Sequence, residues 1–272
     1  MSEDRAGASL RTPILGTAAA GLLLLALWQA GHAAYGTLVL PSPAETFWAM
    51  GKLATNGTLL PAVAQTAANA LAGFAAAVLV GGMLGTFAGL WSPARHLLQP
   101  IATLALGVPA IAWVVLSLLW FGGSGLAVAF TVLVTTAPIV FAAATQGVLT
   151  LDGSLRRMAR SFRVPWHVLM TDVYLPHMLT HLFPALATAL AMSWKIAVMT
   201  ELLGGTGGIG DGLATARVQV DTAAAMAWIV VIVVLLWMQD RLLLEPLRSR
   251  LEAWRRELPG AGASAFRSPA AT

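Results

Sequence analysis

The chain has 272 residues, of which 58% are hydrophobic and only 10% are charged, and its formal net charge is +4. This balance excludes an ordinary soluble globular domain and indicates an integral membrane protein. The absence of cysteine excludes disulfides, thiol catalysis and cysteine metal sites.

Long stretches of the chain carry no Asp, Glu, Lys or Arg, and each is long enough for a membrane span of about 20 residues. The stretch from Leu97 to Leu151 has room for two spans, with FGGSG at Phe121 to Gly125 as the turn between them. The sequence therefore predicts an all-α membrane protein of about six transmembrane helices. They are expected near Pro13 to Ala34, Ala67 to Leu90, Pro100 to Phe121, Leu126 to Val148, Leu179 to Leu203 and Thr222 to Met238.

Positive charges divide unevenly between the two sides of this predicted bundle. Arginines gather near the N-terminus, in the long loop 151–176 and after the sixth span, whereas the opposite side keeps only Lys52 and Arg217. Since Lys and Arg in short loops favour the cytoplasmic side, we expect both termini and the loop to be cytoplasmic. The positive net charge then expresses membrane topology and gives no evidence of nucleic-acid binding.

This topology divides the chain into three segments. Residues 1–12 are expected to form a cytoplasmic N-terminal segment, and residues 13–256 a single transmembrane domain that includes the loop 151–176. The tail over residues 257–272, rich in Gly, Ala, Ser and Pro, is expected to be a disordered cytoplasmic segment.

The loop 151–176 has the pattern of a short amphipathic helix. Its apolar positions follow the i, i+3, i+4, i+7 rule and are Leu155, Met158, Ala159 and Phe162. The opposite arc carries Arg156, Arg157, Arg160 and Arg163. Asp152 is placed to cap the helix and Pro165 to end it. A basic helix between membrane spans is typical of docking to another protein, and the alternative is packing against the chain's own membrane domain.

Three apparent motifs carry less weight than their spacing suggests. The segment Gly205 to Gly210 matches G-x-G-x-x-G, but no strand precedes it, so we interpret it as a flexible outer loop. His177 and His181 have the i, i+4 spacing of helical metal ligands but lack a third ligand, so interfacial packing is expected. No G-x-x-x-x-G-K-[ST] loop and no Ser/His/Asp arrangement occurs, so neither P-loop ATP binding nor enzyme chemistry is predicted.

Two charges interrupt the apolar fifth span, namely Lys195 near its middle and Glu201 toward its outer end. An ionised side chain at the bilayer centre costs roughly 2.5–3.5 kcal/mol on insertion scales, so each should face protein or a water-filled path. Six residues of separation turn the two about 120° apart, so they are not expected to pair. Both are candidates for the lining of a translocation path. The alternatives are pairing with a neighbouring helix and, for Glu201, extension toward the outer surface.

Several segments resemble those of one transporter family. They are LPSPAETFWAM at Leu40 to Met50, GTLLPAVAQTAANALAGF at Gly57 to Phe74, GVPAIAWVVLSLLWFGGSG at Gly107 to Gly125 and TELLGGTGGIGDGL at Thr200 to Leu213. The loop from Arg157 to Pro176 aligns with the cytoplasmic signature of the same family. The chain resembles the permease subunit of an ABC importer from the nitrate, sulfonate, taurine and bicarbonate group.

This resemblance implies a type I ABC importer permease architecture in a bacterial inner membrane, with a cytoplasmic coupling helix. It implies a homodimer that works by alternating access with an external substrate-binding protein and a separate ATP-binding subunit. ATP and magnesium would belong to that subunit, and no cofactor is expected in this chain. The ATPase-docking residues would be Arg156, Arg157, Met158, Ala159, Arg160, Phe162 and Arg163.

The loop departs from the family signature. Ala159, Leu175 and Pro176 agree with it, but its glutamate falls on Arg157 and its glycine on Arg163, while its first alanine falls on Met158. The position of the loop is kept while its charge is reversed. The departure implies either a partner with an acidic groove or a diverged subunit with weak coupling.

Other functions stay open at this point. A proton- or sodium-coupled secondary transporter would use Lys195 and Glu201, and an assembly or anchoring protein would transport nothing. Within the importer family, selection rests largely with the external binding protein, so the sequence names no substrate and a thiamine precursor is a further alternative.

Overall fold

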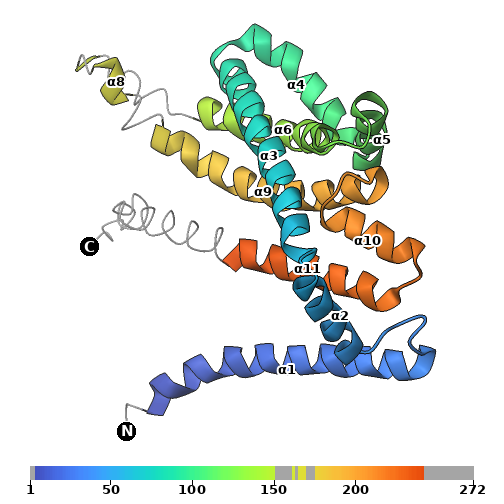
Figure 1. Ribbon diagram of the computed structural model, residues 1–272. Helices are drawn as coiled ribbons and strands as arrows, with labels where there is room; N and C mark the ends of the chain where they lie inside the picture. The colour runs from blue at the N-terminus through green and yellow to red at the C-terminus, as the bar shows by residue number, and fades with distance from the viewer. Residues whose placement is uncertain (1–3, 151–160, 163–164, 170–174, 242–272) are drawn as a thin grey trace.

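The computed structural model describes residues 4–150, 161–162, 165–169 and 175–241, and the elements within these ranges are all helices (Figure 1). They are α1 (Asp4–Tyr35), α2 (Pro43–Thr55), α3 (Leu59–Leu90), α4 (Ser92–Gly107), α5 (Ala110–Phe121), α6 (Gly125–Leu149), α8 (Trp166–Leu169), α9 (Leu175–Gly204), α10 (Ile209–Val218) and α11 (Thr222–Gln239). The all-α prediction is confirmed for this part of the chain.

Within the described residues, four helices are long and apolar enough to cross a membrane, and a fifth span is added if α4 and α5 count as one. The four are α3, α6, α9 and α11, which contain the second, fourth, fifth and sixth predicted spans. The first predicted span lies inside α1, whose 32 residues begin at Asp4. The count of six spans stays a prediction.

The single helix predicted near Pro100 to Phe121 is divided in the structure between α4 and α5. The chain bends by 96° between α4 and α5. The pyrrolidine ring of Pro109 disfavours helical geometry in Val108, whose φ of -76° and ψ of 126° are extended. Proline also lacks the N–H that would continue the helical ladder. The hydropathy of the segment is unaffected by the break, which explains why composition alone did not separate the two helices.

The helices α3 and α6 run parallel in close contact. Gly73 of α3 abuts Val132 of α6, and Gly89, further along α3, abuts Val148. Gly81 and Gly85 sit between them against the α6 backbone, so a methyl group at any of the four glycines would overlap α6. Such small residues allow two helices to approach backbone to backbone.

The parallel order shows that α4 and α5 together cross the bundle. The C-terminal ends of α3 and α6 lie side by side at one end of the bundle, whereas α6 begins at the other end. The connecting helices α4 and α5 therefore run from the first end to the second. There, Gly123 of the α5–α6 turn abuts the Gly204 carbonyl of α9. The Thr222 hydroxyl at the start of α11 donates to the Thr37 carbonyl after α1 at 2.9 Å.

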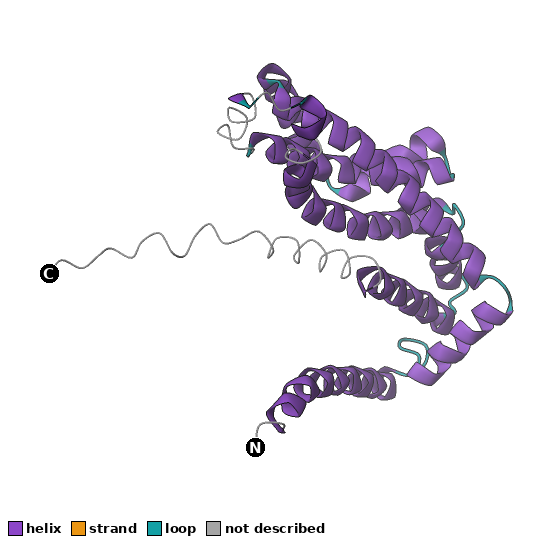
Figure 2. Cartoon of the chain, turned by 90° about the vertical axis from the view of Figure 1, so that its left-hand side faces the viewer, coloured by secondary structure: helices purple, strands orange, loops and turns teal. Residues whose placement is uncertain are grey.

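The bundle therefore has two distinct ends (Figures 1 and 2). One, which we call the loop end, holds the start of α1, the end of α6, α8, the start of α9 and the end of α11. The other, the far end, holds α2 and α10, which carry Lys52 and Arg217. The structure thus separates these two cations from the loop, as the sequence predicted.

Two helices at the far end were not predicted. The α2 helix has a capping box, in which the Ser42 hydroxyl accepts from the Glu45 N–H at 3.2 Å and the Glu45 carboxylate accepts from the Ser42 N–H at 2.8 Å. The α10 helix begins at Ile209. Both are too short to span a membrane, so a search for apolar stretches passes over them.

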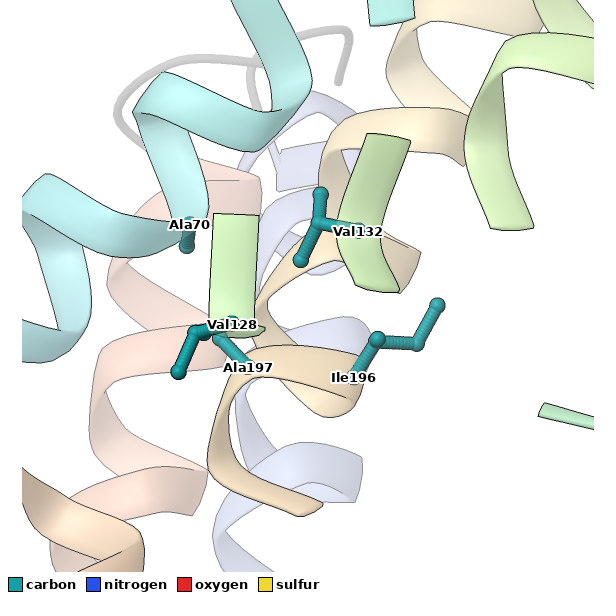
Figure 3. Packing of buried hydrophobic residues seen from close by; sticks show 5 residues of the cluster. All are labelled: Ala70, Val128, Val132, Ile196 and Ala197. Carbon is teal, nitrogen blue, oxygen red and sulfur yellow. The ribbon is translucent and has the colours of Figure 1, made fainter. Parts of the chain in front are cut away.

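The core is built from small and β-branched side chains where α3, α6 and α9 meet. Figure 3 shows its central cluster, formed by Ala70, Val128, Val132, Ile196 and Ala197. Many large apolar side chains elsewhere face outward, including Leu79, Met83, Leu104 and Leu119. An apolar exterior around a core of small residues is the arrangement expected in lipid, where the tails are as apolar as leucine.

Candidate functional site

The loop between α6 and α9 was the first predicted site. Arg156, Arg157, Met158, Ala159, Arg160 and Arg163 lie outside the described residues, so their docking role stays a prediction. Phe162 is described, and 76% of its side chain is exposed in the single chain. This exposure argues against the alternative in which Phe162 packs on the chain's own membrane domain.

The base of this loop is held by a cluster of three side chains. Thr150, the C-cap residue of α6, has its hydroxyl 3.1 Å from His177 Nε2 and 3.0 Å from His181 Nε2 on α9. The hydroxyl has one hydrogen, and it donates this to the Gln146 carbonyl at 2.8 Å. Both histidines therefore donate Nε2–H to Thr150. The residues just before and just after the loop are tied together.

Interfacial packing of His177 and His181 stays a prediction. Their rings lie 5.3 Å apart between centroids and share Thr150 as a partner. Among the described residues, no group of three His, Cys, Asp or Glu side chains is placed to hold a metal ion.

Lys195 lies on the exposed side of α9. Its neighbour Ile196 belongs to the central cluster (Figure 3). Trp194 packs against that cluster. Lys195 itself is exposed, and no acidic side chain in the described part of the chain forms a salt bridge with it. In a bilayer, such a cation requires water or another protein chain beside it.

Glu201 is fully buried, in contrast to Lys195. Its Oε2 accepts from the Thr66 hydroxyl of α3 at 2.7 Å and from the Gly210 N–H of α10 at 3.2 Å. The Thr66 oxygen in turn accepts from the Ile209 N–H at 2.9 Å. The carboxylate thus caps the first turn of α10, where free N–H groups and the helix dipole favour a negative charge.

Two further polar contacts lie at the same end of the bundle. Gln65 Nε2 donates to Asn69 Oδ1 at 3.3 Å, and Asn69 Oδ1 lies against Gly125 at the start of α6. Glu201 therefore faces protein, as expected, and does not reach the surface. A role for Glu201 in lining a path stays a prediction.

The interpretation of Gly205 to Gly210 as a flexible outer loop was wrong for its second half. Ile209 is fully buried and Gly210 lies within α10. Gly208 has a φ of 96° and sits against the Glu201 carboxylate, so a side chain there would overlap it. The glycines allow the chain to turn tightly around a buried acid. The sequence did carry a signal for this turn, namely the acidic Glu201 seven positions before Gly208 in an apolar region.

Sequence comparison relates the chain to membrane components of transport systems. The family model for "Binding-protein-dependent transport system inner membrane component" matches residues 77–242. The taurine transport system permease protein TauC of Escherichia coli is 28% identical over 81% of this chain and 82% of its own length. The riboflavin transport system permease protein RibX of Chloroflexus aurantiacus is 30% identical over 89% of this chain and 91% of its own length. The nitrate import permease protein NrtB of Synechococcus elongatus is 26% identical, covering 69% and 71%.

Proposed function

We propose that this chain, which belongs to the family of binding-protein-dependent transport system inner membrane components, moves a small oxyanion inward as one half of a permease homodimer. The chain is a membrane permease of the ABC importer class, and it is a transport subunit rather than a catalytic enzyme. Family membership favours an ATP-driven importer over the coupled secondary transporter.

Hydrolysis of ATP would take place on a separate ATP-binding subunit, which would also hold the magnesium ion. The absence of a P-loop motif from this sequence supports that division of labour. The subunit would dock on the loop between α6 and α9, where the exposed Phe162 supplies an apolar contact. A binding protein outside the membrane would deliver the solute to the far end of the bundle.

The exposed position of Lys195 is the observation on which the choice of an oxyanion rests. It is exposed on a membrane-spanning helix, so we place it beside a water-filled path between the two copies. Its charge gives that path a positive potential, which suits a sulfonate or nitrate. Two relatives are named for taurine, which bears a sulfonate group beside its ammonium group, and for nitrate.

The test is uptake by the complete importer reconstituted in liposomes with its ATP-binding subunit and binding protein. We expect vanadate-sensitive accumulation of labelled taurine, a short alkanesulfonate or nitrate. Uptake that continues under vanadate but stops with an uncoupler at constant ATP would show a secondary transporter instead.

A flavin is the second candidate solute, because the riboflavin permease RibX is 30% identical over 89% of this chain. Riboflavin is a neutral heterocycle, so its transport would not require a cation such as Lys195 in the path. Saturable uptake of riboflavin that the oxyanions do not inhibit would favour this candidate and reject the oxyanion.

Replacing Lys195 by glutamine is expected to lower oxyanion uptake about tenfold. A cation roughly 10 Å from an anion at an effective dielectric constant near 20 contributes about 1.7 kcal/mol, which is close to a tenfold change. Initial uptake rates in liposomes measure the effect, with assembly checked by gel filtration. The matched control is Lys195→Arg, which keeps the positive charge at the same position of α9 and should retain most of the uptake. Equal uptake by the wild type and the Lys195→Gln variant would reject a path role for this residue.

Both termini and the loop are expected to face the cytoplasm. The cysteine-free chain allows single cysteines at Ser9, Ser154 and Ser264, with Asn56 after α2 as the reporter for the opposite side. An impermeant thiol reagent applied to intact cells should label Asn56→Cys alone. Labelling of Ser154→Cys from outside would overturn this orientation.

A further inference from the structure

A groove of about 200 Å³ lies between α4 and α6 and takes no part in the sites described above. Arg95, Gln99 and Thr103 line it from α4, at positions that share one face of that helix. Gln146 lines it from α6. The lining residues include one cation and no acidic side chain, so the groove has a positive polar part.

The charged and carboxamide side chains of the lining lie toward the loop end. Because α4 begins at the loop end and α6 ends there, Arg95, Gln146 and the apolar Leu149 lie nearest to it. Leu106 and Pro138 lie at the other end of the groove, and eleven residues of helix place Leu106 about 16 Å beyond Arg95. Phe141 supplies apolar surface between these two levels. A groove with this gradient matches an amphiphile that has an anionic head and an aliphatic chain.

Arg95 has donor capacity left for such a head. It is half-buried, and its guanidinium reaches the Ser92 hydroxyl only at the limiting distance of 3.5 Å. A guanidinium has five N–H donors in a planar fork, which suits two oxygens of a phosphate at once. The carboxamides of Gln99 and Gln146 add neutral donors at the same level.

We propose that this groove binds an anionic phospholipid of the inner leaflet, with the headgroup phosphate at Arg95 and the first part of an acyl chain along Phe141 and Leu106. The groove volume of about 200 Å³ is several times the roughly 30 Å³ of one water molecule. A volume of this size suits a headgroup and the start of an acyl chain. Basic pockets between membrane helices on the cytoplasmic side bind such headgroups. The proposal rests on the proposed orientation, in which the loop end is cytoplasmic.

The test is titration of the purified permease with phosphatidylglycerol in nanodiscs of phosphatidylcholine, with bound lipid counted by native mass spectrometry. We expect Arg95→Gln to weaken the tightest phosphatidylglycerol site about fivefold, because one basic side chain near a membrane surface contributes about 1 kcal/mol. Arg217→Gln removes the same charge at the far end and should leave that site unchanged. Ala142→Phe fills the groove while keeping Arg95, so it should weaken the site as well.

Three outcomes would overturn the proposal. The first is equal phosphatidylglycerol affinity in the wild type and Arg95→Gln. The second is displacement of the lipid by 1-pentanesulfonate at concentrations that saturate uptake, which would make the groove a solute site. The third is an intermolecular disulfide in oxidised Ala142→Cys, which would show that a second copy covers the groove. Lipid counting needs no transported solute, so a failure of the oxyanion proposal in the uptake assay would leave this test intact.

Discussion

Replacing Phe162 by aspartate is expected to uncouple transport from ATP hydrolysis while leaving the membrane bundle folded. The side chain is 76% exposed in the single chain, so the bundle loses no packing when it changes. At the proposed interface, the new carboxylate would replace an apolar contact, and loss of a central aromatic contact costs about 2 kcal/mol or more, roughly 30-fold in affinity. The measurement is ATPase activity stimulated by the loaded binding protein.

A conservative variant serves as the control for Phe162. Phe162→Leu keeps an apolar side chain and should retain most of the stimulation. The thermal unfolding midpoint of the isolated permease should be the same in the wild type and in both variants. Normal stimulation in Phe162→Asp would show that this residue has no part in docking. A lowered midpoint would show instead that it packs within its own chain.

Replacing Glu201 by alanine is expected to destabilise the far end of the bundle. The change leaves the Gly210 N–H buried without its acceptor, whereas the Thr66 hydroxyl loses the shorter of its two contacts and keeps the Ala62 carbonyl at 3.1 Å. A buried polar group that loses its partner costs about 1–3 kcal/mol. Thermal unfolding of the permease in detergent measures this effect. The control is Asp211→Asn, which neutralises a nearby acid of α10 outside the network and should cost less than about 1 kcal/mol.

A double-mutant cycle tests whether Glu201 acts through Thr66. Thr66→Val removes the hydroxyl that joins Glu201 to Ile209 and nearly keeps the side-chain volume. Directly bonded residues show coupling energies of about 0.5–3 kcal/mol, so the two changes together should cost less than their sum. Additive costs would show that the two side chains stabilise the fold independently.

Hydropathy predicted the elements that depend on burial in lipid. The span expected from Leu126 to Val148 is α6, which runs from Gly125 to Leu149, because its apolar run is bounded by small residues. The segment GVP at residues 107–109 did carry the signal of a break, since a proline disfavours helix in the residue before it. A helix interrupted by proline and a continuous one have the same hydropathy, so the bend itself required the structure.

The polar network at the far end was beyond prediction for a different reason. Glu201 and its partner Thr66 are separated by 135 positions in the sequence, and no local spacing relates them. The sequence did limit the choice, because an acid in an apolar span requires protein or water around it. Which of these encloses Glu201 depends on how α3 and α9 pack, whereas Lys195 on the same helix is left exposed.

The close contact between α3 and α6 connects the two ends of the permease. Four glycines bring α3 close to α6, with Gly81 and Gly85 against its backbone, and close-packed interiors transmit strain rather than absorb it. The pair extends from Thr150 at one end to Gly125, which lies against Asn69, at the other. If the ATP-binding subunit docks on the loop as proposed, we expect a displacement of the loop to be transmitted along this pair of helices to Gly125.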